Sequence, residues 1–178
     1  MKIPKHIENI LSELEKAGYQ AYLVGGCVRD LLMGRTPFDW DITTNAKPEE
    51  IQKIFIDSVY ENNFGTVGVK VRHSEEETEV VEVTPFRKEE SYSDKRHPDK
   101  VIFTQKVEDD LARRDFTVNA IALHLISHNL ELISQKERSK IQDTGYKIID
   151  PFGGKKDIEA KLIKAVGKPE DRFNEDAL

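Results

Sequence analysis

The fold is decided by the stretch Leu23-Val-Gly-Gly-Cys-Val-Arg-Asp-Leu-Leu-Met-Gly34, which is followed by Asp39-Trp-Asp-Ile-Thr43. Residues 21–24 predict a short buried strand, and residues 27–33 predict a helix directly after the glycine pair. Because Gly25 and Gly26 have no Cβ atom, the backbone between these elements can approach a phosphate closely. The helix start offers free N–H groups, and Arg29 in its first turn can add a charge-assisted hydrogen bond. Ordinary tight turns also contain glycine pairs, so both interpretations stay open.

Two aspartates lie on the next predicted strand, residues 38–42. Residues two apart on a strand point to the same face, so the carboxylates of Asp39 and Asp41 are expected side by side, with Trp40 directed into the core. At about 4 Å and an effective dielectric near 20, two such charges repel by roughly 4 kcal/mol. Mg²⁺ relieves this repulsion and commonly binds carboxylates together with substrate phosphates. The pattern predicts a metal site, although an exposed acidic strand end has the same sequence.

A third carboxylate would complete such a site, and Glu82 is the best candidate. It lies in Val80-Val-Glu-Val-Thr84, where it alternates with apolar neighbours. A cage of this kind can hold two metal ions about 3.5–4 Å apart, which activate an attacking hydroxyl and stabilise the leaving phosphate. That chemistry is phosphoryl or nucleotidyl transfer. A glutamate that merely faces solvent shows the same alternation, so the role of Glu82 is open at this point.

The rest of the chain mixes helices and strands without a regular βαβ order. Apolar spacing and turn residues place these elements along the sequence. Helices are predicted at 7–14, 48–55, 107–114 and 157–162, strands at 66–72, 78–84 and 117–125, a charged loop at 87–100 and a peripheral excursion at 127–146. We therefore predict an α/β (α+β) domain with a mixed β-sheet flanked by helices.

Composition excludes several classes of protein. The chain has 178 residues, of which 34% are charged, and a net charge of -6. This acidity argues against a self-sufficient basic nucleic-acid binder. No apolar run reaches the roughly 18 residues of a membrane span, and the polar start is unlike a signal peptide. A soluble, cytoplasmic protein without a membrane partner is expected.

The cysteine and the histidines suggest little chemistry. Cys27 is the only cysteine, which excludes a disulfide scaffold. It is predicted to be a buried apolar filler, with a thiol activated by the helix dipole as the alternative. The histidines His73, His97, His124 and His128 show no spacing typical of a metal site.

Five motifs together resemble class II tRNA nucleotidyltransferases, the CCA-adding enzymes, whose motifs bacterial poly(A) polymerases share. The two stretches quoted above are joined by Asp110-Leu-Ala-Arg-Arg-Asp-Phe-Thr-Val-Asn-Ala120, Asp150-Pro-Phe-Gly-Gly-Lys-Lys-Asp157 and Arg172-Phe-Asn-Glu-Asp-Ala-Leu178. The resemblance implies a polymerase-β-like nucleotidyltransferase head, followed by helical neck, body and tail regions. Residues 1–168 would form the head, and residues 169–178 a truncated first turn of the neck, with Asn174 capping its helix.

The resemblance also implies roles for individual residues. Asp39 and Asp41 match the metal-binding catalytic carboxylates, with Glu82 as the third catalytic candidate. Gly25, Gly26 and Arg29 lie in the motif that contacts the incoming triphosphate.

Further positions match the parts of the family that recognise the nucleotide. Arg114 and Asp115 match the pair that recognises the ribose, and Asn119 supports that segment; a surface ion pair is the alternative for these charges. Glu175 and Asp176 match the first half of a base-reading E-D-x-x-R motif. The arginine of that motif would be residue 179, which lies outside these 178 residues.

The implied activity is template-independent addition of CCA to tRNA 3′ ends from CTP and ATP, with release of pyrophosphate. The loop at 87–98 is similar to one in CCA-adding and A-adding enzymes, and Phe64-Gly-Thr-Val-Gly-Val-Lys70 differs from the corresponding stretch of poly(A) polymerases. A-adding enzymes and poly(A) polymerases are the alternatives. The family implies Mg²⁺, with two ions, and allows a homodimer of the full-length protein. A non-catalytic nucleotide- or RNA-binding fragment and a metal-independent tRNA scaffold are alternatives of another class.

Overall fold

The computed structural model describes residues 1–60, 65–74, 77–90, 100–126 and 145–175. Its helices are α1 Lys5–Lys16, α2 Gly26–Leu32, α3 Pro48–Ile54, α4 Val107–Ala112, α6 Gly154–Glu159 and α7 Pro169–Glu175, with the 3₁₀ helix η1 Thr117–Asn119. Its strands are β1 Ala21–Val24, β2 Asp41–Thr44, β3 Ser58–Tyr60, β4 Val67–Arg72, β5 Thr78–Pro85, β6 Arg87–Glu90, β7 Lys100–Phe103, β8 Ala122–Leu125 and β9 Tyr146–Ile149.

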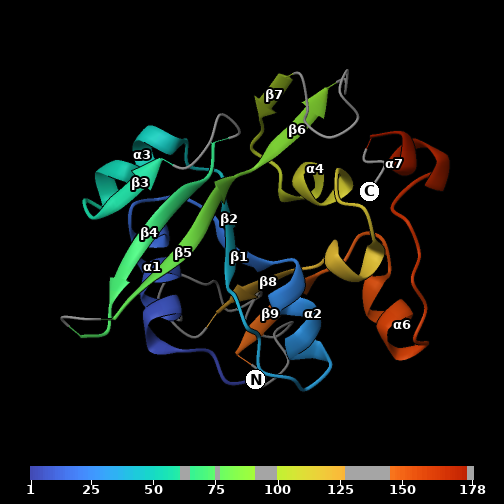
Figure 1. The fold of residues 1–178 in the computed structure, drawn as a ribbon, viewed down its shortest axis with the longest axis horizontal. Helices are drawn as coiled ribbons and strands as arrows, with labels where there is room; N and C mark the ends of the chain where they lie inside the picture. The colour runs from blue at the N-terminus through green and yellow to red at the C-terminus, as the bar shows by residue number, and fades with distance from the viewer. Residues whose placement is uncertain (61–64, 75–76, 91–99, 127–144, 176–178) are drawn as a thin grey trace, which may run out of the picture.

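A seven-stranded mixed sheet runs through the molecule in the order β3-β4-β5-β2-β1-β8-β9 (Figure 1). β2 and β5 pair in parallel, whereas the other described neighbours are antiparallel. The strands predicted at 66–72 and 78–84 are confirmed as the antiparallel pair β4 and β5. β6 and β7 form a separate two-stranded ribbon beside α4. The mixed sheet with flanking helices confirms the predicted α/β (α+β) class.

Hydrophobic side chains cover both faces of the central strands. On the first face, here called the α1 face, the apolar sides of α1 and α2 pack against Leu23, Ile42 and Val83. On the opposite face, the α4 face, Val24 packs with Leu111 of α4. Because strand side chains alternate between the faces, neighbouring residues of one strand enter different environments.

The second strand begins later than the sequence predicts. Residues 38 and 39 form a bend, and β2 starts at Asp41, so Asp39 precedes the strand instead of lying on it. The reason is the neighbouring strand: β1 ends at Val24, and the chain turns at Gly25 into α2. No β1 residue is left to pair with Asp39. Trp40 is buried as predicted.

Three other boundaries also differ from the predictions. Residues 87–90 form strand β6 instead of a loop, because their backbone pairs with residues 100–103. The predicted strand at 117–125 is confirmed only at 122–125, since residues 117–119 form η1. The last helix begins at Pro169 and already contains Asn174, which therefore is not its N-cap. Proline suits this first helical position, where its missing N–H costs no hydrogen bond.

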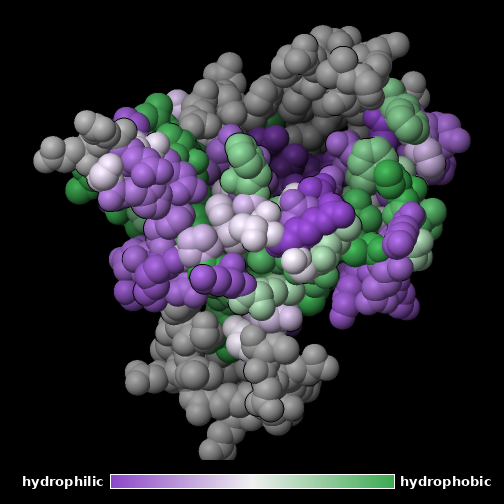
Figure 2. All heavy atoms as spheres, turned by 60° about the horizontal axis from the view of Figure 1, so that its bottom comes forward, coloured by the Kyte–Doolittle hydropathy of each residue, from purple (hydrophilic) through white to green (hydrophobic). Residues whose placement is uncertain are grey.

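The surface agrees with the charged composition. Hydrophilic residues cover most of the described face in Figure 2, and apolar residues gather in smaller patches. No helix within the described ranges is long and apolar enough to cross a membrane. Cys27 is buried as predicted, and burial raises the pKa of its thiol to about 11. The activated-thiol alternative is therefore wrong, because a reactive cysteine needs a lowered pKa.

Candidate active site

Two of the three predicted carboxylates, Asp41 and Glu82, lie side by side on the α4 face of the sheet. Asp41 of β2 and Glu82 of β5 are partners in the parallel register. Ile42 and Val83, the next residues of the two strands, belong to the core on the α1 face. The alternation of the strands therefore directs Asp41 and Glu82 away from that core, toward the same side of the sheet.

The environment of Asp41 fits a cation. Burial raises the pKa of the Asp41 carboxyl, the nearby Arg114 guanidinium opposes this shift, and the charge of Asp39 adds to it. Asp39 itself is exposed, at the bend before the strand. A divalent cation among these carboxylates would remove the cost of charging Asp41, and hard oxygen ligands are those that Mg²⁺ prefers. Asp39 and Asp41 with Glu82 would hold such an ion.

Gly25 lies directly beside this group. A Cβ atom at this position would be 3.0 Å from Nη1 of Arg114 and 3.4 Å from Oδ2 of Asp41. The residue also has φ +79°, which other residues rarely adopt. The backbone angle favours glycine here, and an added Cβ atom would also press on the end of the Arg114 side chain. At Gly26 the nearest atom to an added Cβ would be Nη2 of Arg29, at 3.5 Å.

A buried carboxylate, Asp110 of α4, holds two arginines at the site. Its side chain is fully buried, and Nε and Nη2 of Arg113 both lie 3.0 Å from its Oδ1. Nη2 of Arg114 lies 3.6 Å from Oδ2, to which Thr43 also donates at 3.4 Å. Burial lowers the pKa of the Arg114 guanidinium, and the charge of Asp110 opposes this. Asp110 thus compensates positive charge that would otherwise be costly to bury.

Arg29 is positioned by a second set of contacts. Its Nη1 donates to Oδ1 of Asn119 at 2.9 Å, and its Nε donates to Oδ1 of Asp30 at 2.9 Å. Asn119 is the last residue of η1, so this turn orients an arginine of α2. The structure therefore links two of the predicted nucleotide-binding residues directly.

Asp41, Glu82 and Arg114 line a cavity of about 320 Å³ on the α4 face. Its lining combines carboxylates of β2 and β5 with an arginine of β6 and the two arginines that follow α4. The lining residues are Val24, Asp41, Ile42, Thr66, Glu82, Thr84, Arg87, Arg113 and Arg114. Nε of Arg114 is buried and has no hydrogen-bond partner within the described part of the chain. A ligand with anionic or hydroxyl oxygens would satisfy this donor.

Some predicted residues are not brought together by these contacts. Asp115 is exposed, and its backbone carbonyl accepts a hydrogen bond from Val166. Glu175 is the last residue of α7, and Asp176 lies outside the described residues. α7 nevertheless approaches the site, because Nη1 of Arg172 donates to the carbonyl oxygen of Arg113 at 2.9 Å.

The sequence interpretation assigned no role to Asp110, although a sequence pattern was available. Val107 and Leu111 lie on the buried side of α4. Asp110 is three residues after Val107 and one before Leu111, so it lies on the same side. A carboxylate among core positions needs a charged or hydrogen-bonding partner. Arg113 and Arg114 follow within one turn and could have been paired with it.

Fold and site together define a nucleotidyltransferase head: a mixed sheet that presents carboxylates of neighbouring strands beside a glycine turn and paired arginines. The chain belongs to the Poly A polymerase head domain family, whose family model matches residues 21–164.

Several similar proteins support this assignment. The chain is 45% identical over 170 residues to the CCA-adding enzyme of Lactobacillus delbrueckii subsp. bulgaricus and 44% identical over 169 residues to that of Listeria monocytogenes. Each match covers 95% of this chain and 37% of the relative. The chain therefore spans little more than a third of the length of these curated relatives.

Solved structures show the same fold. The Bacillus stearothermophilus CCA-adding enzyme in complex with CTP matches with a TM-score of 0.74 and 38% identity, over 99% of this chain and 37% of that chain. A tRNA nucleotidyltransferase complexed with a primer tRNA and an incoming ATP analog matches with a TM-score of 0.63 and 29% identity. This match covers 94% of this chain and 41% of that chain. The predicted polymerase-type head is thereby confirmed.

Proposed function

We propose that this head catalyses the addition of CCA to tRNA 3′ ends from CTP and ATP, with release of pyrophosphate. The observation that carries the proposal is the register of Asp41 and Glu82 on parallel strands, beside Gly25 and Arg114. The relatives named CCA-adding enzymes at 44–45% identity support this substrate class. The activity of a whole enzyme would also need the regions that these longer relatives possess.

The carboxylates would act on the reacting groups. Asp39 and Asp41 would hold Mg²⁺, and Glu82 would complete the oxygen ligands on the neighbouring strand. When bound, two ions would supply activation of the attacking hydroxyl and stabilisation of the leaving phosphate. The raised pKa of the Asp41 carboxyl supports this role, because a cation would favour its charged form.

The basic residues would bind and orient the nucleotide. Gly25 and Gly26 would let the triphosphate approach the backbone, and Arg29, held by Asn119, would donate to its oxygens. Arg114 would donate to the ribose from its buried Nε, with Asp115 as an acceptor for a ribose hydroxyl.

The surrounding regions would complete the enzyme. We place the head at residues 1–168 and the start of a helical neck at 169–178, which the start of α7 at Pro169 supports. Glu175 and Asp176 would contribute to base selection there. The homodimer and the cytoplasmic location stay predictions.

A head exchange tests the activity. Residues 1–178 would replace the corresponding head of the Lactobacillus delbrueckii enzyme, and the chimera would be incubated with Mg²⁺, labelled CTP and ATP, and tRNA that lacks its 3′ CCA. We expect incorporation of both nucleotides and loss of incorporation in Asp39→Ala/Asp41→Ala. Incorporation of ATP alone onto tRNA ending in CC would instead assign A addition. A folded chimera that adds neither nucleotide would contradict the proposal, and unchanged activity in the double variant would contradict the metal assignment.

A further inference from the structure

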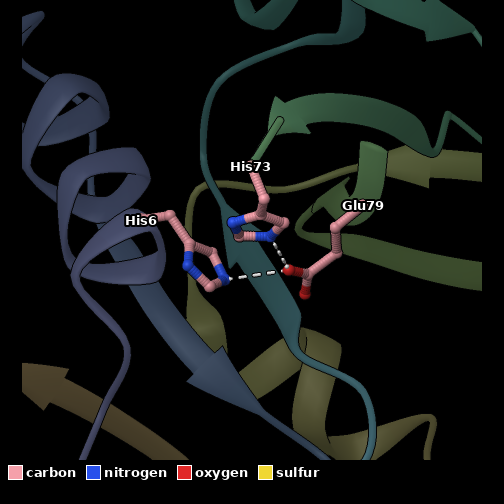
Figure 3. A group of neighbouring side chains, drawn as sticks. All are labelled: His6, His73 and Glu79. Atoms are coloured by element: carbon pink, nitrogen blue, oxygen red, sulfur yellow. Dashed lines mark hydrogen bonds and ion pairs between the residues drawn. The ribbon is translucent and has the colours of Figure 1, made fainter. Parts of the chain in front are cut away.

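A cluster of two histidines and a glutamate lies away from the proposed active site (Figure 3). His6 belongs to the first turn of α1, His73 directly follows β4, and Glu79 is the second residue of β5. The three residues are separated along the chain, which explains why the spacing of the histidines did not predict a site. The fold brings one potential ligand atom of each within 4.8 Å of the others.

The imidazole nitrogens converge on one carboxylate oxygen. Nε2 of His73 lies 2.8 Å from Oε2 of Glu79, and Nε2 of His6 lies 3.1 Å from the same atom. The two rings are edge to face, with centroids 4.9 Å apart. Figure 3 shows both rings directing a nitrogen toward the carboxylate of Glu79.

Hydrogen bonding leaves this arrangement incomplete. Nε2 of His6 is buried and makes no hydrogen bond within the described part of the chain, although it lies 3.1 Å from Oε2 of Glu79. A buried polar nitrogen normally has a partner. An ion placed between the three side chains would give this nitrogen one.

We propose that His6, His73 and Glu79 form a binding site for Zn²⁺. Two imidazole nitrogens and a carboxylate are a common three-ligand set for this ion, with a water in the fourth position. Tetrahedral bonds of about 2.0–2.2 Å place ligand atoms roughly 3.4 Å apart, so the nitrogen-to-oxygen separations here are within ~0.6 Å of that value. The side chains are 22–34% exposed, which leaves a path for the ion and the water.

The site differs from the proposed active site in chemistry and position. Imidazole ligands suit Zn²⁺, whereas carboxylates alone suit Mg²⁺. Glu79 shares the α1 face with Val81 and Val83, while Glu82 faces the opposite side, about 10 Å further along β5. Zn²⁺ would therefore connect the start of α1 to the far end of the β4–β5 hairpin without touching the catalytic carboxylates.

Calorimetric titration with Zn²⁺ tests the proposal on the tag-free, metal-stripped chain 1–178, with excess Mg²⁺ to occupy the carboxylate site. We expect one Zn²⁺ per chain and an increase in the thermal unfolding temperature. His73→Ala and Glu79→Gln should each weaken binding at least tenfold and abolish the thermal shift. X-ray absorption of the zinc complex should show two imidazoles bound, and one in His73→Ala.

A matched control is provided by His124, whose Nε2 lies 2.8 Å from Oε1 of Glu15 on the same helix α1. This pair has no third ligand among the described residues. His124→Ala should therefore bind Zn²⁺ as tightly as the parent chain. The proposal is overturned if the parent chain binds no Zn²⁺ under these conditions, or if His73→Ala and Glu79→Gln bind it as tightly as His124→Ala does. Neither result depends on nucleotidyl transfer.

Discussion

Replacing Gly154 by alanine should destabilise the head more than the same change one residue earlier. Gly154 is the first residue of α6, and a Cβ atom there would lie 2.0 Å from the carbonyl oxygen of Thr117 and 3.0 Å from Cδ1 of Ile121. A carbon–oxygen contact needs about 3.3 Å, so α6 and η1 would have to separate by ~1.3 Å. The obstacle is backbone, which cannot rotate away as the end of a side chain can.

The magnitude follows from three contributions. Overpacking costs about 3 kcal/mol at its usual upper limit. Separation also breaks the hydrogen bond from Oγ1 of Thr117 to Oδ2 of Asp157, now 2.6 Å, for about 1 kcal/mol. The higher helix propensity of alanine, compared with glycine, offsets about 1 kcal/mol of this loss of unfolding free energy. We expect a net loss of about 3 kcal/mol.

Gly153 is the matched control. It has φ +77°, and a Cβ atom there would meet nothing within 4 Å among the described residues, so the expected cost of alanine is the backbone penalty of about 1–2 kcal/mol. Urea unfolding can be followed through Trp40, the single and buried tryptophan. If Gly154→Ala costs no more than Gly153→Ala, the packing argument is wrong.

The same change should reach the nucleotide site. Thr117 and Asn119 are the two ends of η1, and Asn119 holds Arg29. A displaced η1 should raise KM for the nucleotide in molecules that remain folded, whereas Gly153→Ala should leave KM within about twofold. An unchanged KM in folded Gly154→Ala would show that η1 does not position the arginine.

Three other changes test the site and the core. Asp110→Asn should cost about 2–4 kcal/mol of unfolding free energy because it leaves buried arginine charge uncompensated. The control Asp109→Asn changes a carboxylate whose side chain is 24% exposed, and it should cost less than about 1 kcal/mol. Equal urea midpoints for the two variants would refute this prediction. Asn119→Ala should raise KM for the nucleotide about tenfold through the freed Arg29, and an unchanged KM would contradict the pairing. At about pH 8, the native Cys27 thiol should react with a disulfide reagent ~100-fold more slowly than the urea-unfolded chain, because its pKa is raised from 9.0 to about 11. Since the native thiol holds its proton more tightly, its contribution to stability is complete below pH 9 and falls as the pH rises toward 11; native reactivity equal to that of the unfolded chain would refute the burial argument.

The sequence could predict features that depend on local pattern. The buried strand at 21–24, the hairpin partners β4 and β5 and the helix α3 all follow from apolar spacing and turn residues. The same alternation correctly set Glu82 apart from the apolar residues of its strand. These predictions succeed because burial acts on each element through its own periodicity.

Features that depend on distant pairing could not be predicted in this way. The start of β2 at Asp41 follows from the length of β1, and the strand at 87–90 exists only because residues 100–103 pair with it. The joining of His6 to Glu79 likewise requires segments far apart in the sequence. No single window of the sequence contains both members of such a contact.

The carboxylates of the proposed site are placed by the hydrophobic core itself. Burying Ile42 and Val83 against α1 and α2 fixes which residues of β2 and β5 face each side of the sheet. Asp41 and Glu82, the neighbours of these two residues, therefore face the α4 side. A slip of one residue in either strand would put an aspartate or glutamate into the apolar core and a hydrophobic residue at the site. The free energy that opposes such a slip is the burial of several aliphatic side chains, at about 1.5–3 kcal/mol each. The same packing that stabilises the sheet therefore holds the two carboxylates together at the cavity, where a bound cation would join Arg114 in compensating the charge of Asp41.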